Sequence, residues 1–262
     1  MYILLGILQG ITEWLPVSSS GQSMLALINL LHTNPQTALS IAIYVHTGTL
    51  LAVLVRFRED FRLMIKSYAS VRENKIVLYL IVSTLITALV GLPTYILMKK
   101  SLNILAEDGE LITAAVGLFL VYTGVYLFFS RKKYGQRDVG EIKTRDMIIG
   151  GAAQGLSIIP GVSRSGVTVS TLLFLGFRGD TALKLSFLMS VPAVLGALGL
   201  DLAQGTSSAI SNSGVLIACF FSFISGYATM DLLLKYSKKI RFDVFCVIFG
   251  LTAVLVSIAG VL

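Results

Sequence analysis

The sequence predicts an all-α polytopic membrane protein, a bundle of helices that crosses a membrane several times. Charged residues make up 13% of the chain and hydrophobic residues 55%, whereas a soluble domain carries about 25% charged residues. Several windows without charge run for about 18 to 24 residues, enough for a helix to cross about 30 Å of hydrocarbon. These windows are continuously apolar rather than alternating, which argues against a transmembrane β-barrel. We expect no cleavable signal peptide, because the N-terminus lacks a basic region before its apolar stretch.

Six apolar segments are the expected membrane spans, and the charges between them predict their orientation. The segments are roughly 38–55, 76–98, 111–130, 185–201, 213–234 and 244–262. The connections rich in Lys and Arg are 56–75, 131–146 and 235–243, and those poor in cations are 31–37, 99–110 and 202–212. Positive connections tend to stay in the cytoplasm, so the first group is predicted to be cytoplasmic and the second external. The same clustering explains the net charge of +7, and we expect no nucleic-acid partner.

Two further segments, 1–30 and 147–177, are predicted to be re-entrant helical hairpins. Each is interrupted in its middle by a cluster of Pro, Gly and Ser residues. Such backbone is tolerated at membrane depth only where it is buried in protein or lines a wet cavity. The second segment lies between the cytoplasmic connection 131–146 and the charged stretch 178–184, so it is expected to enter and leave the membrane on one side.

The two hairpin segments resemble each other and indicate an internal repeat. Residues 9–21 align without a gap on residues 154–166, with Gln-Gly, Val-Ser and Ser-Gly at matching positions. Each half then holds one hairpin and three spans, and because three is odd, the second half must be inverted. The prediction is one membrane domain, residues 1–262, with repeat 1 at about 1–130, a cytoplasmic linker at 131–146 and repeat 2 at about 147–262. A chance match of two serine-rich stretches is the alternative.

Arg164 and Glu13 are the charged residues whose positions are hardest to explain. Arg164 is the only one of the 21 Lys and Arg residues that does not lie in, or at the edge of, a polar connection. Glu13 is one of few acids that also lie away from the connections. A charge at membrane depth is costly unless it is paired or solvated, so both residues are functional candidates. Inverted repeats with broken helices place their site at the repeat interface near the midplane, where the two could meet. A purely structural ion pair is the alternative.

The two interrupted loops are expected to bind an oxyanion. Each loop contains several hydroxyl side chains and precedes a predicted helix start, where free N–H groups and the helix dipole favour anions. The guanidinium of Arg164 adds a planar fork that suits phosphate oxygens. Phosphate or diphosphate is the favoured ligand, and a carboxylate is a less demanding alternative.

Glu13 follows Gln9 by four residues, so the two side chains project from one face of a helix. Beside a diphosphate, Glu13 could act as a general base or hold a divalent cation, while Gln9 offers a neutral ligand or a hydrogen bond. A loop serine could attack phosphorus if a base removes its proton. His46, in the first half of a span, is either an acid or base of the site or a hydrogen-bonded packing residue. His32 lies at a predicted loop and is not expected to take part.

Several other polar residues have simpler interpretations. Thr12, Ser20 and Thr168 are better explained as helix caps, or as hydroxyls bonded to the preceding turn, than as reactants. Cys219 and Cys246 lie singly in apolar segments, without the spacing of metal ligands. Both cysteines are expected to be buried packing residues.

These motifs resemble those of the undecaprenyl-diphosphate phosphatase family, whose members confer bacitracin resistance. The first motif, Glu/Gln-x-x-x-Glu followed by Leu-Pro-Val-Ser-Ser, stands at residues 9–19, and the second, Pro-Gly-x-Ser-Arg-Ser-x-x-Thr, at residues 160–168. The resemblance covers essentially the whole chain. It implies a membrane enzyme that hydrolyses an undecaprenyl-type diphosphate to the monophosphate and inorganic phosphate, recycling the lipid carrier for cell-envelope glycan synthesis.

The resemblance also implies roles for individual residues. Glu13 would be catalytic, Arg164 would bind phosphate, and Ser19 would be a candidate nucleophile. The expected substrate-binding residues are Gln9, Ser18, Gln22, Ser163, Ser165 and Thr168. A divalent cation, Mg²⁺ or Ca²⁺, is expected with Glu13 as its ligand. The site is expected to face the outside of the plasma membrane, with the bilayer and the lipid substrate as partners, and copies of the chain could associate into a homo-oligomer.

Two positions depart from the family pattern. The family usually has His after Ser-Ser-Thr-Gly, whereas this chain has Gln22, which cannot shuttle a proton. The family commonly has Gln where this chain has His46. We hypothesise that His46 and Gln22 have exchanged chemical duties, which makes His46 a fourth catalytic residue. The alternative function is a transporter or flippase of a lipid-linked phosphate or another anion, because inverted repeats with broken helices are also transporter architecture.

Overall fold

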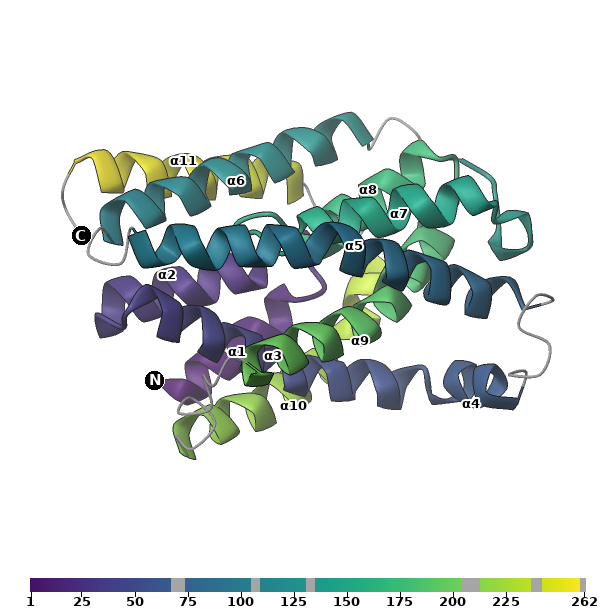
Figure 1. The fold of residues 1–262 in the computed structure, drawn as a ribbon, viewed down its shortest axis with the longest axis horizontal. Helices are drawn as coiled ribbons and strands as arrows, with labels where there is room; N and C mark the ends of the chain where they lie inside the picture. The colour runs from purple at the N-terminus through teal and green to yellow at the C-terminus, as the bar shows by residue number, and fades with distance from the viewer. Residues whose placement is uncertain (67–73, 105–108, 131–134, 204–212, 237–241, 260–262) are drawn as a thin grey trace.

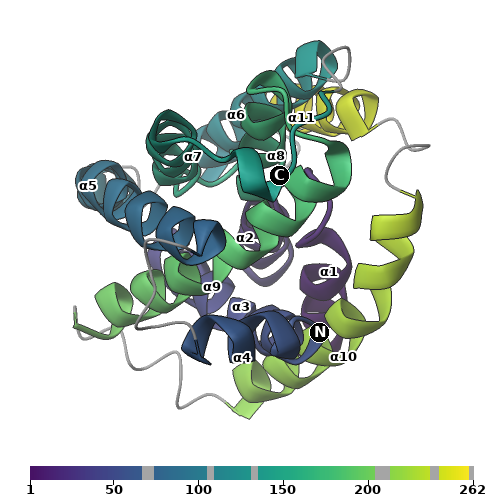
Figure 2. The ribbon, with the colours of Figure 1, turned by 90° about the vertical axis from the view of Figure 1, so that its right-hand side faces the viewer.

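The computed structural model describes residues 1–66, 74–104, 109–130, 135–203, 213–236 and 242–259, and these ranges are almost entirely α-helical. The helices are α1 (Tyr2–Thr12), α2 (Ser19–Leu31), α3 (Pro35–Arg56), α4 (Arg58–Lys66), α5 (Lys75–Ile104), α6 (Gly109–Ser130), α7 (Thr144–Leu156), α8 (Arg164–Phe174), α9 (Gly179–Ala203), α10 (Ser213–Tyr236) and α11 (Phe242–Ile258). Most of them run roughly along the longest axis of the molecule (Figure 1). In the end-on view of Figure 2, α2 and α8 lie toward the middle, with α5, α6, α11 and α10 around them.

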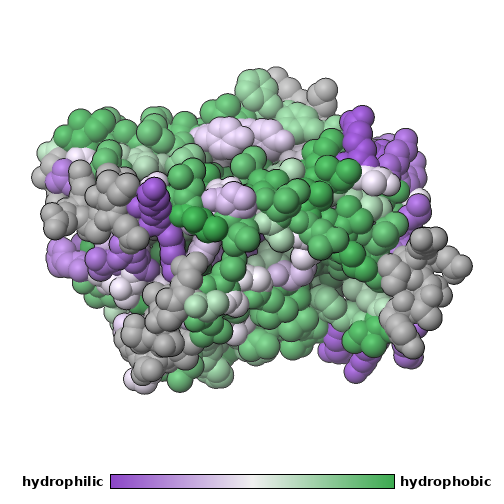
Figure 3. Space-filling view, viewed as in Figure 1, coloured by the Kyte–Doolittle hydropathy of each residue, from purple (hydrophilic) through white to green (hydrophobic). Residues whose placement is uncertain are grey.

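The long helices have the length and composition of membrane spans. Within the described ranges, five helices are long and apolar enough to cross a membrane, namely α3, α5, α6, α9 and α10. Hydrophobic side chains cover the middle of the molecule and hydrophilic ones gather toward its two ends (Figure 3). The prediction of an all-α polytopic membrane protein is therefore confirmed.

One predicted span is described only in part, and another belongs to a longer helix. The segment 244–262, described up to residue 259, overlaps α11, whose 17 residues lie at the lower end of the roughly 17–25 that a span needs. The segment 185–201 is part of a longer helix, because α9 already begins at Gly179. Asp180 in its first turn accepts a hydrogen bond from Thr181 N at 2.9 Å, and a carboxylate at this position stabilises a helix start.

Besides α4, four of the described helices are much shorter than a membrane span, and they form two pairs. The helices α1, α2, α7 and α8 have 11, 13, 13 and 11 residues, which corresponds to lengths of about 17–20 Å. The break between α1 and α2, and that between α7 and α8, coincide with the loops that contain Pro16 and Pro160. Proline removes a backbone donor and disfavours helix in the preceding residue, which explains why both segments break there.

Glycines allow the first helix of each pair to pack closely against a long helix. Gly10 of α1 faces α10, where an added Cβ would come 2.6 Å from Gly226 N. Gly155 of α7 faces α5, where an added Cβ would come 3.0 Å from Gly91 N. Small residues at such contacts let helix backbones approach each other in an apolar environment.

The contact between α6 and α11 is reciprocal. A Cβ added to Gly117 would lie 2.7 Å from Gly250 O, and one added to Gly250 would lie 2.5 Å from Gly117 O. Each glycine therefore meets the backbone of the other, and the two helices approach closely.

Arg137 fastens the segment before α7 to the end of α8. Its guanidinium donates to Asp146 Oδ2 at 2.5 Å and to the Leu175 carbonyl at 2.6 Å, and it lies 4.3 Å from the ring centroid of Phe177. Asp146 is only 2% exposed, so this ion pair is buried.

Gly10→Val is expected to destabilise the protein, because its side chain would collide with the backbone of α10. Overpacking a filled interface typically costs about 1–3 kcal/mol. A lower thermal unfolding temperature in detergent would measure this loss. Gly196→Ala is the matched control, because no described atom lies within 4 Å of a Cβ added to this glycine of α9. An equal loss in the two variants would contradict the packing argument.

Candidate functional site

Two short helices begin at the same place in the structure. α2 begins at Ser19 and α8 begins at Arg164. The hydroxyls of the preceding residues, Ser18 and Ser163, each accept a hydrogen bond from the backbone N–H three residues later, at 3.3 and 3.2 Å. Both serines are therefore N-caps, and the positive ends of two helix dipoles come together.

The two loops before these helices are bonded to each other. Gly161 N donates to Ser18 Oγ at 3.0 Å, and Ser165 Oγ donates to Leu15 O at 2.9 Å. Ser18 has a φ of 56°, a left-handed conformation that is uncommon for a residue other than glycine. Such a conformation persists where surrounding contacts over-determine the backbone, often at functional sites. The contacts between the loops thus fix the two helix starts relative to each other.

Glu13, directly after α1, lies at the centre of a buried polar network. Its Oε2 accepts hydrogen bonds from Gln9 Nε2 at 2.8 Å and Ser19 Oγ at 2.6 Å. His46 Nε2 lies 3.1 Å from the same oxygen, and Arg164 Nη2 donates to Oε1 at 2.5 Å. The carboxylate is only 6% exposed, so it depends on these partners for its charge. The four predicted catalytic residues, which come from α1, α2, α3 and α8, therefore meet at one point.

A hydrogen bond to its own helix orients His46. Its Nδ1 lies 2.5 Å from the carbonyl oxygen of Ala42. A carbonyl only accepts, so Nδ1 carries the proton. Nε2 then faces Glu13 Oε2 at 3.1 Å and Ser19 Oγ at 3.5 Å, as a base when it is bare and as a donor when it is protonated. His46 is therefore a member of the polar network around Glu13.

Arg164 is held by α9 as well as by Glu13. Its Nη1 donates to the carbonyl oxygen of Ser186 at 3.1 Å. Thr168 Oγ1 donates to the Arg164 carbonyl at 2.7 Å and lies 2.6 Å from Ser186 Oγ. A guanidinium has a planar set of N–H donors, so Arg164 can keep these partners and still donate to an anion.

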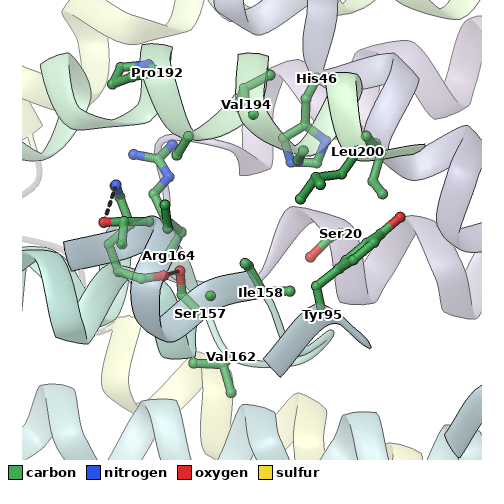
Figure 4. Close-up of a pocket in the computed structure, with 18 of the residues that line it drawn as sticks. Ser20, His46, Tyr95, Ser157, Ile158, Val162, Arg164, Pro192, Val194 and Leu200 are labelled. Carbon is green, nitrogen blue, oxygen red and sulfur yellow. Dashed lines mark hydrogen bonds between the residues drawn. The ribbon is translucent and has the colours of Figure 1, made fainter. Parts of the chain in front are cut away.

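The network borders a cavity of about 490 Å³ whose walls are mainly α3, α5 and α9. The walls beyond the two loops are mainly apolar or small and include Ala88, Gly91 and Leu92 of α5 and Val194, Gly196 and Ala197 of α9. Figure 4 shows Arg164 on one side of the cavity and Tyr95 and Leu200 on the other. A cavity with one polar end and apolar walls suits a ligand with an anionic head and an apolar body.

The predicted site residues divide into those that line the cavity and those that lie next to it. The residues that line it are Glu13, Ser18, Ser19, His46, Ser163, Arg164 and Ser165. Gln9 and Thr168 are fully buried and contact Glu13 and Arg164. Gln22 is also buried, and its Nε2 donates to Val17 O at 2.8 Å. These last three therefore support the loops and the charged pair.

The motifs do not predict three further residues of the site. Gln154 lines the cavity, and its Nε2 donates to Thr87 Oγ1 at 3.3 Å and to Met189 O at 3.2 Å. Its buried Oε1 has no partner among the described residues. The repeat alignment could have revealed Gln154, because it stands opposite the first residue of the first motif. Ser186 and Thr123 stand in no motif, and only the packing of α9 and α6 brings them to the site.

Several simpler interpretations can be checked directly. Thr12 Oγ1 donates to Leu8 O at 2.6 Å, which confirms that this threonine bonds the preceding turn. Cys246 is buried as predicted, whereas Cys219 is only partly buried. His32 is exposed at the end of α2, away from the cavity.

The residues that line the cavity offer few ligands for the expected divalent cation. Within the described residues, no three His, Cys, Asp or Glu side chains gather as metal ligands. Glu13 is the one carboxylate among the described residues that line the cavity. This set cannot enclose an ion by itself. It does fit Mg²⁺ or Ca²⁺ that takes further ligands from substrate phosphates and water, as Mg²⁺ commonly does.

Comparison with known proteins gives a consistent result. Residues 2–255 match the family model described as bacitracin resistance protein BacA. The chain is 45% identical over 249 residues to an undecaprenyl-diphosphatase of Methanothrix thermoacetophila, covering 95% of this chain and 93% of that protein. It is 39% identical to an undecaprenyl-diphosphatase of Methanopyrus kandleri, with 98% and 96% covered. It is 38% identical to one of Methanococcoides burtonii, with 97% and 96% covered.

Thr123→Val is expected to loosen the loop before α8. Thr123 Oγ1 donates to Gly161 O at 3.3 Å and accepts from Ser163 N at 3.2 Å, so valine would leave a buried N–H without its partner. The expected cost is about 1–3 kcal/mol, measured as a lower thermal unfolding temperature. Thr252→Val is the matched control on α11, because this exposed threonine only bonds its own helix at Ile248 O. Equal unfolding temperatures for the two variants would refute the role of Thr123.

Proposed function

The chain belongs to the bacitracin resistance protein BacA family, and we propose that it is an integral membrane undecaprenyl-diphosphatase whose reaction takes place at Glu13, Ser19, His46 and Arg164. The observation that carries the assignment of the site is the convergence of these four side chains at two helix N-termini, on the wall of a mainly apolar cavity. The reaction releases inorganic phosphate and a polyprenyl monophosphate, which returns the lipid carrier to cell-envelope glycan synthesis.

The cavity is proposed to bind the two parts of the substrate at different places. The diphosphate lies at the starts of α2 and α8, where N–H groups, serine hydroxyls and Arg164 attract phosphate oxygens. The prenyl chain lies along the apolar walls formed by α5 and α9. Burial of the chain supplies binding energy that is largely independent of the phosphate contacts.

Ser19 is proposed to attack the terminal phosphorus. Its hydroxyl donates to Glu13 Oε2 at 2.6 Å, so this carboxylate can accept the proton as the Oγ–P bond forms. The bond from phosphorus to the bridging oxygen breaks, and the polyprenyl monophosphate leaves. Water then cleaves the phosphoserine and releases inorganic phosphate. Arg164 and the two helix N-termini stabilise charge on the transferred group. Direct attack by a water that Glu13 orients is the alternative.

His46 is proposed to carry the proton that the family's usual histidine would carry. Its Nε2 lies within reach of both Glu13 Oε2 and Ser19 Oγ, at 3.1 and 3.5 Å. Gln22 instead donates to Val17 O and holds the first loop in place. These positions support the hypothesis that the two residues have exchanged duties.

A divalent cation is proposed to join the site together with the substrate. Glu13 would provide its carboxylate ligand, and the hydroxyl of Ser19 lies beside it. When bound, such an ion neutralises charge on the phosphates.

We also propose that the two halves, residues 1–130 and 147–262, are inverted repeats with re-entrant hairpins. α1 packs on α10 as α7 packs on α5, and α6 and α11 meet reciprocally at Gly117 and Gly250. A two-fold relation between the halves would produce all three contacts. The lengths of α1, α2, α7 and α8, well below that of a span, also support re-entrant hairpins.

The site is proposed to open toward the outside of the plasma membrane. The connections after α3 and before α7 are rich in Lys and Arg and therefore tend to stay in the cytoplasm. The cavity reaches Tyr95 and Leu200. These residues lie near the C-terminal ends of α5 and α9, which are the ends away from the predicted cytoplasmic connections. Transport of a lipid-linked phosphate is not favoured, because the relatives are named for diphosphatase activity and the serine–carboxylate pair suits phosphoryl transfer.

Glu13→Ala and Arg164→Ala are each expected to lower phosphate release from undecaprenyl diphosphate by about 10²-fold or more, because they remove the proton acceptor and the phosphate ligand. Phosphate release by purified protein in detergent measures the effect, and gel filtration verifies folding. Glu59→Ala is the control, since this acid on α4 is 68% exposed and should not affect turnover. Equal release by all these proteins would exclude the proposed enzyme site. Lipid movement in proteoliposomes without phosphate release would support transport instead.

His46→Gln is expected to lower kcat by about 10²-fold and to remove the imidazole-dependent limb of the pH–rate profile. The double variant His46→Gln with Gln22→His should recover part of kcat and a new pH dependence, because it restores the family's usual arrangement. Unchanged turnover and an unchanged pH profile in His46→Gln would show that the exchange hypothesis is wrong.

A further inference from the structure

A second network of buried polar side chains lies at the end of the cavity away from Arg164. Asp201 of α9 is 0% exposed. Its Oδ1 accepts hydrogen bonds from Lys99 Nζ at 2.9 Å, Tyr95 Oη at 3.1 Å and Ser40 Oγ at 3.2 Å. Ser40 belongs to α3, and Tyr95 and Lys99 belong to α5. The Asp201 network, defined by these four residues, therefore ties together the three helices that form most of the cavity wall.

The Asp201 network is continuous with the wall of the cavity. Tyr95 itself lines the cavity. Leu39, Met98 and Leu200, the sequence neighbours of the other three members, line it as well. Figure 4 shows Tyr95 and Leu200 together on the side of the cavity opposite Arg164. A displacement of Asp201 would therefore displace residues that a bound ligand touches.

The helices α5 and α9 each contain a proline before they reach the Asp201 network. Pro93 interrupts α5, and Pro192 interrupts α9. Proline removes one hydrogen bond of the helix ladder and is a common cause of bending. The part of α9 before Pro192 is largely buried and contacts Arg164 through Ser186. Beyond Pro192, no described atom lies within 4 Å of a Cβ added to Gly196 or Gly199.

The part of α9 beyond Pro192 lines the cavity with small and apolar residues, and Asp201 bonds it to α3 and α5. A buried ion pair is a poor means of raising stability, because the desolvation of both charges offsets much of their attraction. In some proteins such a pair fixes one arrangement among several of similar energy. The Asp201 network has this form, since one carboxylate oxygen receives three donors from two neighbouring helices.

We propose that the Asp201 network sets the width of the apolar part of the cavity and thereby the preference of the enzyme for a long prenyl chain. Asp201 is a positioning residue, which acts through Tyr95 and the walls of α5 and α9. The walls keep contact with a prenyl chain only at a defined separation, because dispersion contacts weaken steeply with distance. A diphosphate with a short chain relies mainly on the Arg164 end. The proposal rests on the diphosphatase function proposed above.

The test compares undecaprenyl diphosphate with geranyl diphosphate, which has two isoprene units, in full-length Asp201→Asn and Lys99→Met. We expect KM for undecaprenyl diphosphate to rise by about fourfold or more, the effect of leaving roughly one methylene group unburied. We expect kcat for undecaprenyl diphosphate, and KM for geranyl diphosphate, to change by less than about twofold. Both depend mainly on contacts with the diphosphate, which lie at the Arg164 end of the cavity. If geranyl diphosphate turns over too slowly, its inhibition constant against the long substrate replaces KM.

The matched control is Asp146→Asn, which removes the other buried aspartate ion pair described above, that with Arg137. Asp146→Asn should lower thermal stability without changing the ratio of the KM values for the two substrates. The proposal would be overturned if KM changed equally for both substrates in Asp201→Asn. It would also be overturned if the ratio of the two KM values stayed unchanged in both the Asp201 and the Lys99 variants. Lys99→Met, which changes a partly exposed side chain, provides the result if Asp201→Asn does not fold. If the unmodified protein hydrolyses neither substrate, the proposed function fails instead.

Discussion

The buried ion pair between Glu13 and Arg164 is the interaction on which the rest of the site depends. The two residues are 151 positions apart, yet a hydrogen bond joins them within an apolar part of the bundle. Removing one partner of a buried pair typically costs about 3–5 kcal/mol, because the other charge is left without compensation. The pair is therefore formed only when both interrupted segments fold and meet. The same requirement places Ser19 and His46 beside the carboxylate.

The broken helices provide what a continuous span could not. A span satisfies its backbone internally, whereas each break yields a helix start with free N–H groups and a positive dipole end. Ser18 and Ser163 cap these starts, and the bonds between the two loops hold them together. Glycines on α1 and α7 let the short helices pack closely against α10 and α5. The chain thereby creates an anion site inside an apolar bundle.

α9 connects the two polar networks of the protein. Its first part accepts a hydrogen bond from Arg164 at the carbonyl of Ser186, and its last part carries Asp201. Pro192 lies between them and lines the cavity. The chemistry at one end and the shape of the apolar walls at the other are thus set by different segments of one helix. This separation allows the chain preference to change without a change in the phosphate site.

The sequence by itself determined the helical membrane fold and the breaks at Pro16 and Pro160, and it singled out Glu13, Arg164 and His46 as candidates for the site, whereas the choice of Ser19 among the loop serines came from the family resemblance. These features depend on local properties, namely apolar length, proline and serine content, and the cost of a charge away from water. Only the tertiary structure decided that Gln22 supports a loop while His46 faces Ser19. It alone places Thr123 and Ser186 beside the site and assembles the Asp201 network. Their positions depend on the packing of helices distant in sequence, and such packing leaves no local pattern in the chain.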